Sequence, residues 1–305
     1  MQALLDAIAG LQRPADAVRV FHGRGGLHPG CEDWSLDAYP PVWLLTCHAP
    51  ASEETLTALV GALQARWAQI APGEPLHCLF QQRHEARATY RLLAGAELED
   101  HVVTEDGARF AVHLMRGLNH GLFLDMAEGR RWVRRWAQAH PGARVLNLFA
   151  YTCAFSVTAL QGGAGRVVNI DMAAGALGTG KRNHALNGLL EGAAFLPHDV
   201  FASWGRLRRE APYGLVIADP PSHQKGSFVA ERDYARLVRR LPELVAPGGH
   251  ALLCLNSPKL DRAFLRELVD AQAPGLRFVE RLANPTAFAD AEPERALKAL
   301  VFRRD

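Results

Sequence analysis

The sequence predicts an α/β protein: a doubly wound, mostly parallel seven-stranded sheet preceded by a smaller N-terminal domain. From residue 142 onward, short apolar runs alternate with stretches of helical length, a pattern typical of parallel sheets with helices on both faces. The first 95 residues lack this regular alternation. The chain has 305 residues, 49% of them hydrophobic and 22% charged, which is enough for a packed core and about two domains.

A small α/β or α+β domain is predicted for residues 1–98, and we expect it to bind the substrate, with RNA as the candidate. Strand-like segments lie at 18–22, 42–48 and 77–82, and an amphipathic helical stretch covers 52–69. The turn His22-Gly-Arg-Gly-Gly26 is basic and rich in glycine, so it suits the approach of a phosphate, with an ordinary loop as the alternative.

Residues 99–125 predict a linking β-hairpin followed by a lead-in segment. Two alternating segments flank Asp106-Gly107, where glycine tolerates the positive φ of a tight turn. Residues 126–305 then form the sheet domain, whose expected strands are 144–149, 166–170, 194–197, 214–218, 250–256, 277–282 and 298–302. Such sheets bind ligands at the carboxyl ends of their strands, so the residues after each run are the candidates for chemistry.

Charge and cysteine content limit the possible classes of protein. Thirty-four Lys and Arg residues against 32 Asp and Glu give a net charge of +2, so any basic surface for nucleic acid must be local. Arginine clusters near 130–135, 206–209 and 236–240 are spaced as exposed helix faces, which are either solvated or contact RNA. Five scattered cysteines without ligand spacing indicate reduced thiols and no metal site. With no signal peptide and no long apolar window, a soluble, cytoplasmic protein without a membrane partner is expected.

Carboxylates follow two consecutive predicted strands. Asp171 ends the second strand of the sheet domain, where an acidic residue accepts hydrogen bonds from both hydroxyls of a ribose, although a helix N-cap is the alternative. Asp199 follows the third run, where a carboxylate suits the exocyclic amine of adenine. With the turn that begins at Asn147, these positions describe an adenosine site.

The fourth run ends abruptly in Asp219-Pro-Pro. Each proline fixes its own φ and excludes the α region for its predecessor, so the turn is rigid and extended. It would hold the Asp219 side chain and the Pro220 carbonyl toward the ligand cleft, ready to accept hydrogen bonds from a base edge. A proline pair that only terminates the strand is the alternative.

The order Asn147 to Tyr151, Asp171, Asp199, Asp219-Pro-Pro-Ser222 and Pro247-Gly-Gly249 resembles the class I S-adenosylmethionine-dependent methyltransferases, which have a Rossmann-like sheet. Within them it is most similar to the bacterial 23S rRNA methyltransferases of the cytosine-C5 and guanine-N7 types. Segments 121–131, 146–152 and 181–188 carry this likeness, which covers residues 100 to 305.

The resemblance implies S-adenosyl-L-methionine as cofactor. It assigns cofactor binding to Phe123, Asp125, Arg130, Asn147, Phe149, Tyr151, Thr152, Asp171, Met172, Asp199, Val200 and Asp219. Two positions depart from the family pattern: Cys153 stands where glycine is usual, and Ala127 where arginine is frequent. Both departures predict a weaker hold on the cofactor, unless Arg131 supports it instead.

The positions of the cysteines indicate which kind of atom is methylated. Methylation of cytosine C5 requires a thiolate that adds to C6, and the position of that cysteine in relatives is matched here by Ser257. Cys254 lies within a predicted strand, as a buried structural thiol does. We therefore expect direct in-line transfer to an electron-rich acceptor such as a guanine ring nitrogen. The predicted catalytic residues are Asp219, Pro220 and Asn256 for the base and Lys225 for a phosphate.

The function predicted is methylation of a base of RNA, above all large-subunit rRNA, by a monomer or homodimer. One alternative is a methyltransferase of a protein or small molecule, and another is a non-catalytic, cofactor-binding ribosome-assembly factor. A nicotinamide-dependent oxidoreductase would need a Gly-x-Gly-x-x-Gly turn after the first strand, and this chain has Phe-Ala-Tyr-Thr-Cys-Ala there.

Overall fold

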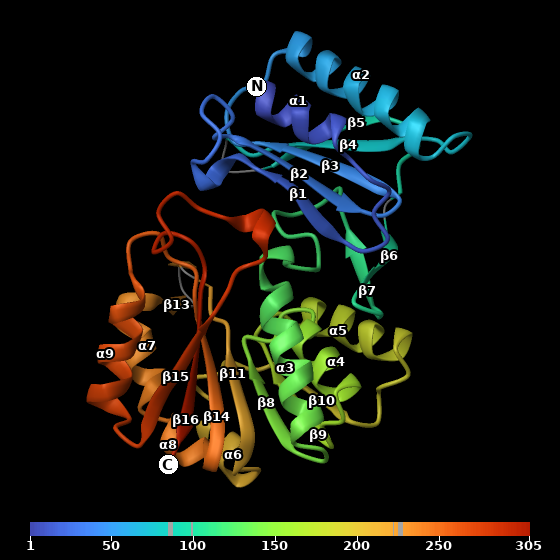
Figure 1. The fold of residues 1–305 in the computed structure, drawn as a ribbon. Helices are drawn as coiled ribbons and strands as arrows, with labels where there is room; N and C mark the ends of the chain where they lie inside the picture. Colours follow the sequence, from blue (N-terminus) through green and yellow to red (C-terminus); the bar gives the residue numbers. More distant parts are fainter. Residues whose placement is uncertain (85–87, 99, 222, 225–227) are drawn as a thin grey trace. The chain divides into compact units, whose positions relative to one another are not determined.

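The computed structural model describes residues 1–84, 88–98, 100–221, 223–224 and 228–305, which fold into two compact units (Figure 1). The first comprises residues 1–125 with 285–293, and the second residues 126–284 with 294–305. Within these described ranges, no helix combines the length and the hydropathy needed to cross a bilayer.

The first unit is an α+β layer of one sheet and two helices. Its sheet has the order β1-β2-β3-β4-β5, antiparallel except for the parallel pair β3–β4. The helices α1 and α2 both pack on one face of that sheet, where Leu56, Leu59, Leu63 and Trp67 of α2 are buried (Figure 1). The elements are α1 (Gln2–Ala9), β1 (Val18–His22), η1 (Gly23–Gly25), β2 (Trp34–Tyr39), β3 (Val42–Cys47), α2 (Glu53–Ile70), β4 (His77–Gln82) and β5 (Thr89–Ala94).

In the first unit, a hairpin of β6 (Asp100–Glu105) and β7 (Ala108–His113) follows β5, and the short helix η2 (Leu124–Met126) follows the hairpin. Asp106 and Gly107 have φ of 49° and 77°, so both central residues adopt the left-handed conformation of the two-residue turn predicted from Asp-Gly. Residues 285–293 also pack in this unit, because Ala291 N–H donates to the Gly25 carbonyl (2.7 Å) and the Phe288 ring lies 5.3 Å from that of His22.

The second unit contains the predicted seven-stranded sheet, in the order β10-β9-β8-β11-β14-β16-β15. Five strands from β10 to β14 are parallel, and β16 is antiparallel to both of its neighbours. The strands are β8 (Arg144–Leu148), β9 (Arg166–Ile170), β10 (Ala193–Leu196), β11 (Tyr213–Ala218), β14 (Val245–Leu255), β15 (Leu276–Leu282) and β16 (Lys298–Arg304).

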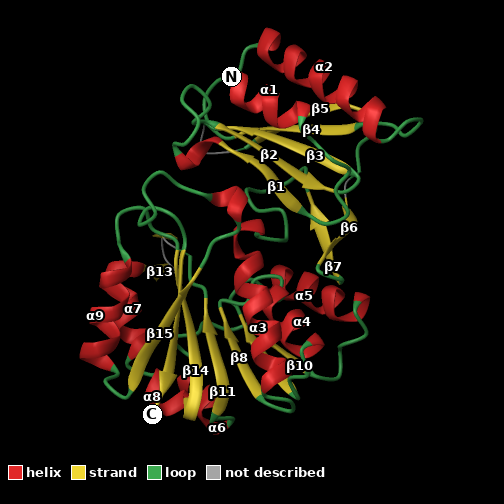
Figure 2. Ribbon diagram, in the orientation of Figure 1, coloured by secondary structure: helices red, strands yellow, loops and turns green. Residues whose placement is uncertain are grey.

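Helices cover both faces of this sheet (Figure 2). Alternate strand residues enter two different cores: Leu146 and Val216 pack with α7, α8 and α9, whereas Val145 and Leu215 pack with α3 and α4. This double burial explains why the strands appear in the sequence as continuous apolar runs. The remaining elements are α3 (Ala127–Ala139), α4 (Ala154–Gln161), α5 (Ala174–Leu186), α6 (Trp204–Arg209), β12 (His223–Gln224), β13 (Phe228–Val229), α7 (Ala230–Val238), α8 (Leu241–Leu244), α9 (Arg262–Gln272) and η3 (Thr286–Phe288), the last in the first unit.

The register aligns the carboxyl ends of the parallel strands. Leu148 of β8 pairs with Ile170 of β9 and with Ala218 of β11, and Ile170 pairs with Leu196 of β10. The residues that follow each of these positions therefore emerge at one edge of the sheet. In the sheet, β9 and β10 lie on one side of β8, and β11 and β14 lie on the other. The strand order therefore reverses at β8, which makes this edge a topological switch point.

Candidate functional site

The turn after β8 has an unusual backbone. Phe149, Tyr151 and Cys153 have φ of 55°, 46° and 60°, a left-handed region that residues other than glycine rarely adopt. Hydrogen bonds fix the turn: Ala150 N–H donates to the Ile170 carbonyl (3.0 Å) and Cys153 N–H to the Ala150 carbonyl (2.7 Å). Each such residue costs about 1–3 kcal/mol, and strain of this kind concentrates at ligand sites.

Asp171 joins the turns that follow β8 and β9. Its Oδ2 accepts from Tyr151 N–H and its Oδ1 from Ala173 N–H, each at 2.8 Å. Helix α5 begins at Ala174 with Ala173 as N-cap, so Asp171 does not occupy the capping position. Each carboxylate oxygen keeps a second lone pair, so the half-buried Asp171 can still accept from the hydroxyls of a ligand. Met172 beside it is 57% exposed.

Cys153 packs against Gly180 of α5. A Cβ atom built on Gly180 would lie only 2.5 Å from the Cys153 Sγ, so the absence of a side chain at 180 makes room for the thiol. Cys153 is fully buried, and burial raises the pKa of its thiol, with a further increase from the charge of Asp171. The departure from the family's glycine is thus accommodated by packing between the turn and α5.

A buried polar network lies beneath the turn. Asn147 donates to Asn169 (2.9 Å), Asn169 donates to Ser156 (3.0 Å), and Ser156 Oγ lies 2.8 Å from His184 Nε2. Burial lowers the pKa of His184, so its ring is neutral at pH 7. Because Nδ1 lies 2.7 Å from the Gly180 carbonyl, it carries the proton and Nε2 accepts from Ser156. The Asn147 side chain is therefore buried in the network that connects the sheet to α4 and α5.

Thr152, which is buried, connects the same turn to α5 because its carbonyl accepts from the Asn183 side chain (3.0 Å). The roles of Asn169, Ser156, Asn183 and His184 were not predicted from the sequence. Asparagine at the centre of an apolar strand run, as in Val-Asn-Ile at 168–170, is the signal that would have indicated a buried network.

The third carboxylate, Asp199, is exposed in the turn after β10, next to the buried Val200. Its Oδ1 accepts from Phe201 N–H (2.8 Å), and the Phe201 ring stacks with Phe228 at 6.2 Å. Phe149 from the turn after β8 lies 5.5 Å from the same Phe228 ring. An aromatic cluster of Phe149, Phe201 and Phe228 thus adjoins the loop that carries Asp199.

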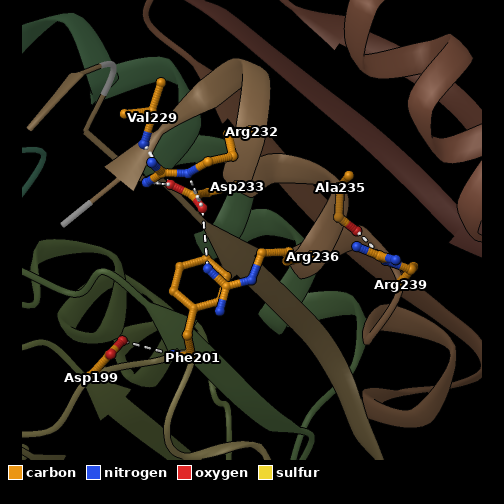
Figure 3. Close-up of polar contacts among 8 residues, drawn as sticks. All are labelled: Asp199, Phe201, Val229, Arg232, Asp233, Ala235, Arg236 and Arg239. Carbon is orange, nitrogen blue, oxygen red and sulfur yellow. Dashed lines mark hydrogen bonds and ion pairs between the residues drawn. The ribbon is translucent and has the colours of Figure 1, made fainter. Parts of the chain in front are cut away.

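Helix α7 places an arginine on this cluster (Figure 3). The Arg236 guanidinium lies 4.3 Å from the centre of the Phe201 ring and ion-pairs with Asp233 (3.2 Å). Asp233 is 1% exposed and also accepts from Arg232 (2.7 Å) and from Val229 N–H (2.9 Å). The hydrogen bond from Arg232 is the main reason that the pKa of Asp233 falls to about 2. Part of the predicted basic helix face is therefore paired internally.

Asp219 and Pro220 follow β11 beside the end of β14. Asp219 is half-buried and Pro220 is buried. The Tyr234 hydroxyl donates to the Cys254 carbonyl (2.6 Å), and the pKa of Tyr234 is raised by burial and further by the charge of Asp219. Cys254 is fully buried in the core between the sheet and α3, as expected of a structural thiol.

Asn256 is exposed directly after β14. The segment that carries it is anchored by Lys298, a fully buried lysine that donates to the carbonyls of Ser257 (2.7 Å) and Glu294 (2.6 Å). From the sequence, Lys298 was predicted only as the start of a strand. Lys225, the predicted phosphate contact, lies outside the described residues.

The predicted lead-in residues are divided between the two units. Phe123, which is 41% exposed, and Asp125 belong to the first unit, whereas Arg130 is buried in α3 of the second. Arg131, on the same helix, pairs with Glu128 at 2.5 Å. Among the residues that the structure describes, no group of three His, Cys, Asp or Glu side chains has the arrangement of a metal site.

Within the second unit, the edge suits an adenosine group. Asp171 offers oxygens for ribose hydroxyls, Asp199 offers the carboxylate oxygen that Phe201 N–H leaves unbonded, and Phe149 and Phe201 supply apolar surface for a ring. The strained, hydrogen-bonded turn after β8 adjoins these groups.

Comparisons with known proteins agree with this chemistry. The sequence profile of a family described as S-adenosylmethionine-dependent methyltransferase matches residues 18–303. The chain is 30% identical over 297 residues to the ribosomal RNA large subunit methyltransferase I of Erwinia tasmaniensis, covering 95% of this chain and 73% of that protein. It is 38% identical over 192 residues to the ribosomal RNA large subunit methyltransferase K/L of a Psychrobacter species.

That second match covers 60% of this chain but only 23% of the relative, so the chain spans about a quarter of the K/L protein. In three dimensions the chain is similar to the crystal structure of SMU.776, described as a methyltransferase complexed with SAH. The TM-score is 0.82 at 23% identity, over 99% of this chain and 81% of that one, which shows a shared fold.

Proposed function

The chain belongs to the S-adenosylmethionine-dependent methyltransferase family, and from this premise we propose that it methylates a base of RNA, specifically of large-subunit rRNA. The relatives' names support the choice of substrate. The observation that carries the proposal is the alignment of the ends of β8, β9, β10 and β11, which gathers Asp171 and Asp219 at one edge, with Asp199 in the adjoining turn. All five cysteines are buried and none forms a disulfide, which supports a cytoplasmic location as part of the same proposal.

The residues proposed to hold the cofactor fit its parts. Asp171 would accept from the ribose hydroxyls, and Asp199 with Val200 would hold the adenine. The turn with Phe149, Tyr151 and Thr152 would cradle the methionine part. The other proposed contacts are Phe123, Asp125, Arg130, Met172 and Asp219, while Asn147 supports the turn through the buried network. When bound, the cofactor supplies an electrophilic methyl group on a sulfonium.

The chain's own residues would orient the acceptor base. Asp219 and Asn256 stand after neighbouring strands, where the carboxylate accepts from base N–H groups and the amide both donates and accepts. The rigid Pro220 would present its carbonyl to the same base, and Lys225 a charge to a phosphate. Positioning and the exclusion of water then provide the acceleration.

We propose direct in-line transfer without a covalent cysteine intermediate. Cys254 and Cys153 are both fully buried, and burial raises the pKa of the Cys153 thiol, which disfavours a thiolate. The resemblance to the cytosine-C5 enzymes matches their nucleophile to Ser257, which has no thiol.

The proposal is tested by incubating the purified protein with methyl-labelled S-adenosylmethionine and total RNA from cells lacking the gene, followed by nucleoside analysis. We expect label in a base of large-subunit rRNA and loss of that label in Asp219→Ala, with the exposed Asp270→Ala as a matched control. Label in protein or a small molecule instead, or no label despite cofactor binding, would refute the proposal and favour another acceptor or an assembly factor.

A further inference from the structure

The first unit brings three basic side chains to one edge of its sheet. Arg24 lies on η1 just after β1, His48 follows β3, and Arg83 follows β4. The register pairs His22 with Ser35, Trp34 with Cys47 and Cys47 with Gln82, so these chain ends lie side by side. The hydrogen bonds of His48 N–H to the Asp33 carbonyl (2.9 Å) and Arg83 N–H to the Cys47 carbonyl (2.8 Å) extend the alignment beyond the strands. We refer to Arg24, His48 and Arg83 as the edge cluster.

Two guanidinium groups of the edge cluster have no counter-charge bound to them. Arg19 nearby is satisfied, because it forms a two-pronged ion pair with Asp37 (2.7 and 2.8 Å) and lies 4.5 Å from the centre of the Phe288 ring. In the described part of the chain, the guanidinium groups of Arg24 and Arg83 make neither a hydrogen bond nor an ion pair. Two of the three arginines at this edge therefore keep their full donor capacity.

Neighbouring positive charges act on the pKa of both guanidinium groups. Burial and then the charge of Arg19 lower the pKa of Arg24, with Asp33 opposing them. Burial and then the charge of Arg24 lower the pKa of Arg83, with Tyr90 and Asp37 opposing. An anion at this edge would offset the repulsion between these positive charges.

His48 contributes as a neutral group. Burial, followed by the charges of Arg24 and Arg83, lowers its pKa to about 4. At neutral pH its ring therefore adds one hydrogen-bond donor without adding to the repulsion. The edge cluster combines two fork-shaped cations with a neutral donor, a set suited to the oxygens of a phosphate.

Glycines hold the turn that presents Arg24. A Cβ built on Gly23 would lie 1.7 Å from the Cys31 carbonyl oxygen, and one on Gly25 would lie 2.1 Å from that of Ala289. These two residues are buried against backbone that cannot move aside, while Arg24 between them is exposed. The predicted basic turn is therefore packed in place with its arginine projecting outward, and its glycines serve packing instead of a direct phosphate approach.

Resting on the proposed function, we propose that the edge cluster of Arg24, His48 and Arg83 binds a backbone phosphate of the RNA substrate. When arginine contacts phosphate, it positions a protein on its nucleic acid without reading the sequence. This role suits the first unit, because the proposed catalytic residues belong to the second. The cluster gives the N-terminal unit a defined role in substrate binding.

The test is binding of a fluorescein-labelled single-stranded RNA oligonucleotide to the full chain, measured by anisotropy across a salt series. Each lost phosphate contact should reduce the slope of log affinity against log salt concentration by about 0.7. At 0.15 M salt this corresponds to about a fourfold loss of RNA affinity. We expect these losses in Arg24→Gln and Arg83→Gln and both together in the double variant. Arg24→Lys should keep the slope.

The matched control is Arg13→Gln, which removes an exposed arginine of the same unit that is already ion-paired with Glu74 (2.7 Å). It should bind as the unmodified protein does, apart from the general effect of one charge. Equal affinity and slope in Arg24→Gln, Arg83→Gln and Arg13→Gln would overturn the proposal, as would a chain that binds no RNA.

Measuring methyl transfer on the same preparations separates the two proposals. If the unmodified chain methylates RNA while Arg24→Gln and Arg83→Gln bind it unchanged, the edge cluster is refuted and the proposed function stands. If binding depends on the cluster but RNA receives no methyl group, the cluster is supported and the proposed function fails.

Discussion

The contact between Cys153 and Gly180 leads to a quantitative prediction about the strained turn. Replacing Gly180 with alanine places a methyl group 2.5 Å from the Cys153 Sγ and 3.1 Å from its Cβ. Overpacking of this kind costs about 1–3 kcal/mol. Alanine in a helix interior gains about 1 kcal/mol over glycine, so we expect a net change in the free energy of unfolding between zero and a loss of about 2 kcal/mol.

Gly178 provides the control on the same helix. Nothing lies within 4 Å of a Cβ built there, so Gly178→Ala should show only the helical gain of about 1 kcal/mol. The difference between the two alanine variants in urea unfolding therefore measures the clash, at about 1–3 kcal/mol. Adding Cys153→Gly to Gly180→Ala should remove it, because glycine both vacates the space and accepts the φ of 60°.

The predicted clash would be refuted if Gly180→Ala stabilised the protein as much as Gly178→Ala does. It would also fail if Cys153→Gly gave the same change in the presence and absence of the added methyl group, since a double-mutant cycle would then show no coupling.

Three further predictions concern buried groups. Lys298→Met removes the donor to the Ser257 carbonyl and should lower the free energy of unfolding by about 1–3 kcal/mol in urea, whereas an unchanged value would show that water replaces the lysine. Asp233 has a depressed pKa of about 2, so its stabilisation is complete above the unfolded value near 4 and disappears as the pH falls toward 2. Over that pH interval, the free energy of unfolding of the unmodified chain should fall by about 1–2 kcal/mol more than that of Asp233→Asn, as measured by urea unfolding at a series of pH values. If the two free energies had the same pH dependence, the role of Arg232 would be contradicted. Cys254→Ser should leave methyl transfer nearly intact, and an inactive variant that still binds cofactor would contradict the non-covalent mechanism.

Much of the second unit could be predicted because its signals are local. Each central strand is buried on both faces, so it appears as an apolar run, and the carboxylates that follow are fixed by the register alone. The Asp106-Gly107 turn was likewise predictable because two positive φ angles limit which residues can occupy it.

The features that were not predicted depend on contacts distant in sequence. Nothing near Pro285 indicates that residues 285–293 pack with the first unit, since the contact of Ala291 with Gly25 exists only in the folded chain. Strand β2 (Trp34–Tyr39) is buried on both faces but contains Ser35 and Asp37, which conceal its apolar character. The compensation of Cys153 by Gly180 requires knowing that α5 crosses the turn.

The most direct test of the central claim is calorimetric titration of S-adenosylhomocysteine, the demethylated form of the cofactor, into the full chain and its Asp171→Asn and Asp199→Asn variants. We predict that S-adenosylhomocysteine binds to one site per chain and that its affinity falls about tenfold or more in Asp171→Asn. A charge-assisted hydrogen bond contributes about 1.4 kcal/mol or more, and about 1.4 kcal/mol corresponds to a tenfold change in affinity. An exposed carboxylate of the same unit, Asp270, serves as control when changed to asparagine. Unchanged affinity in both Asp171→Asn and Asp199→Asn would show that the edge formed by β8, β9 and β10 is not the cofactor site.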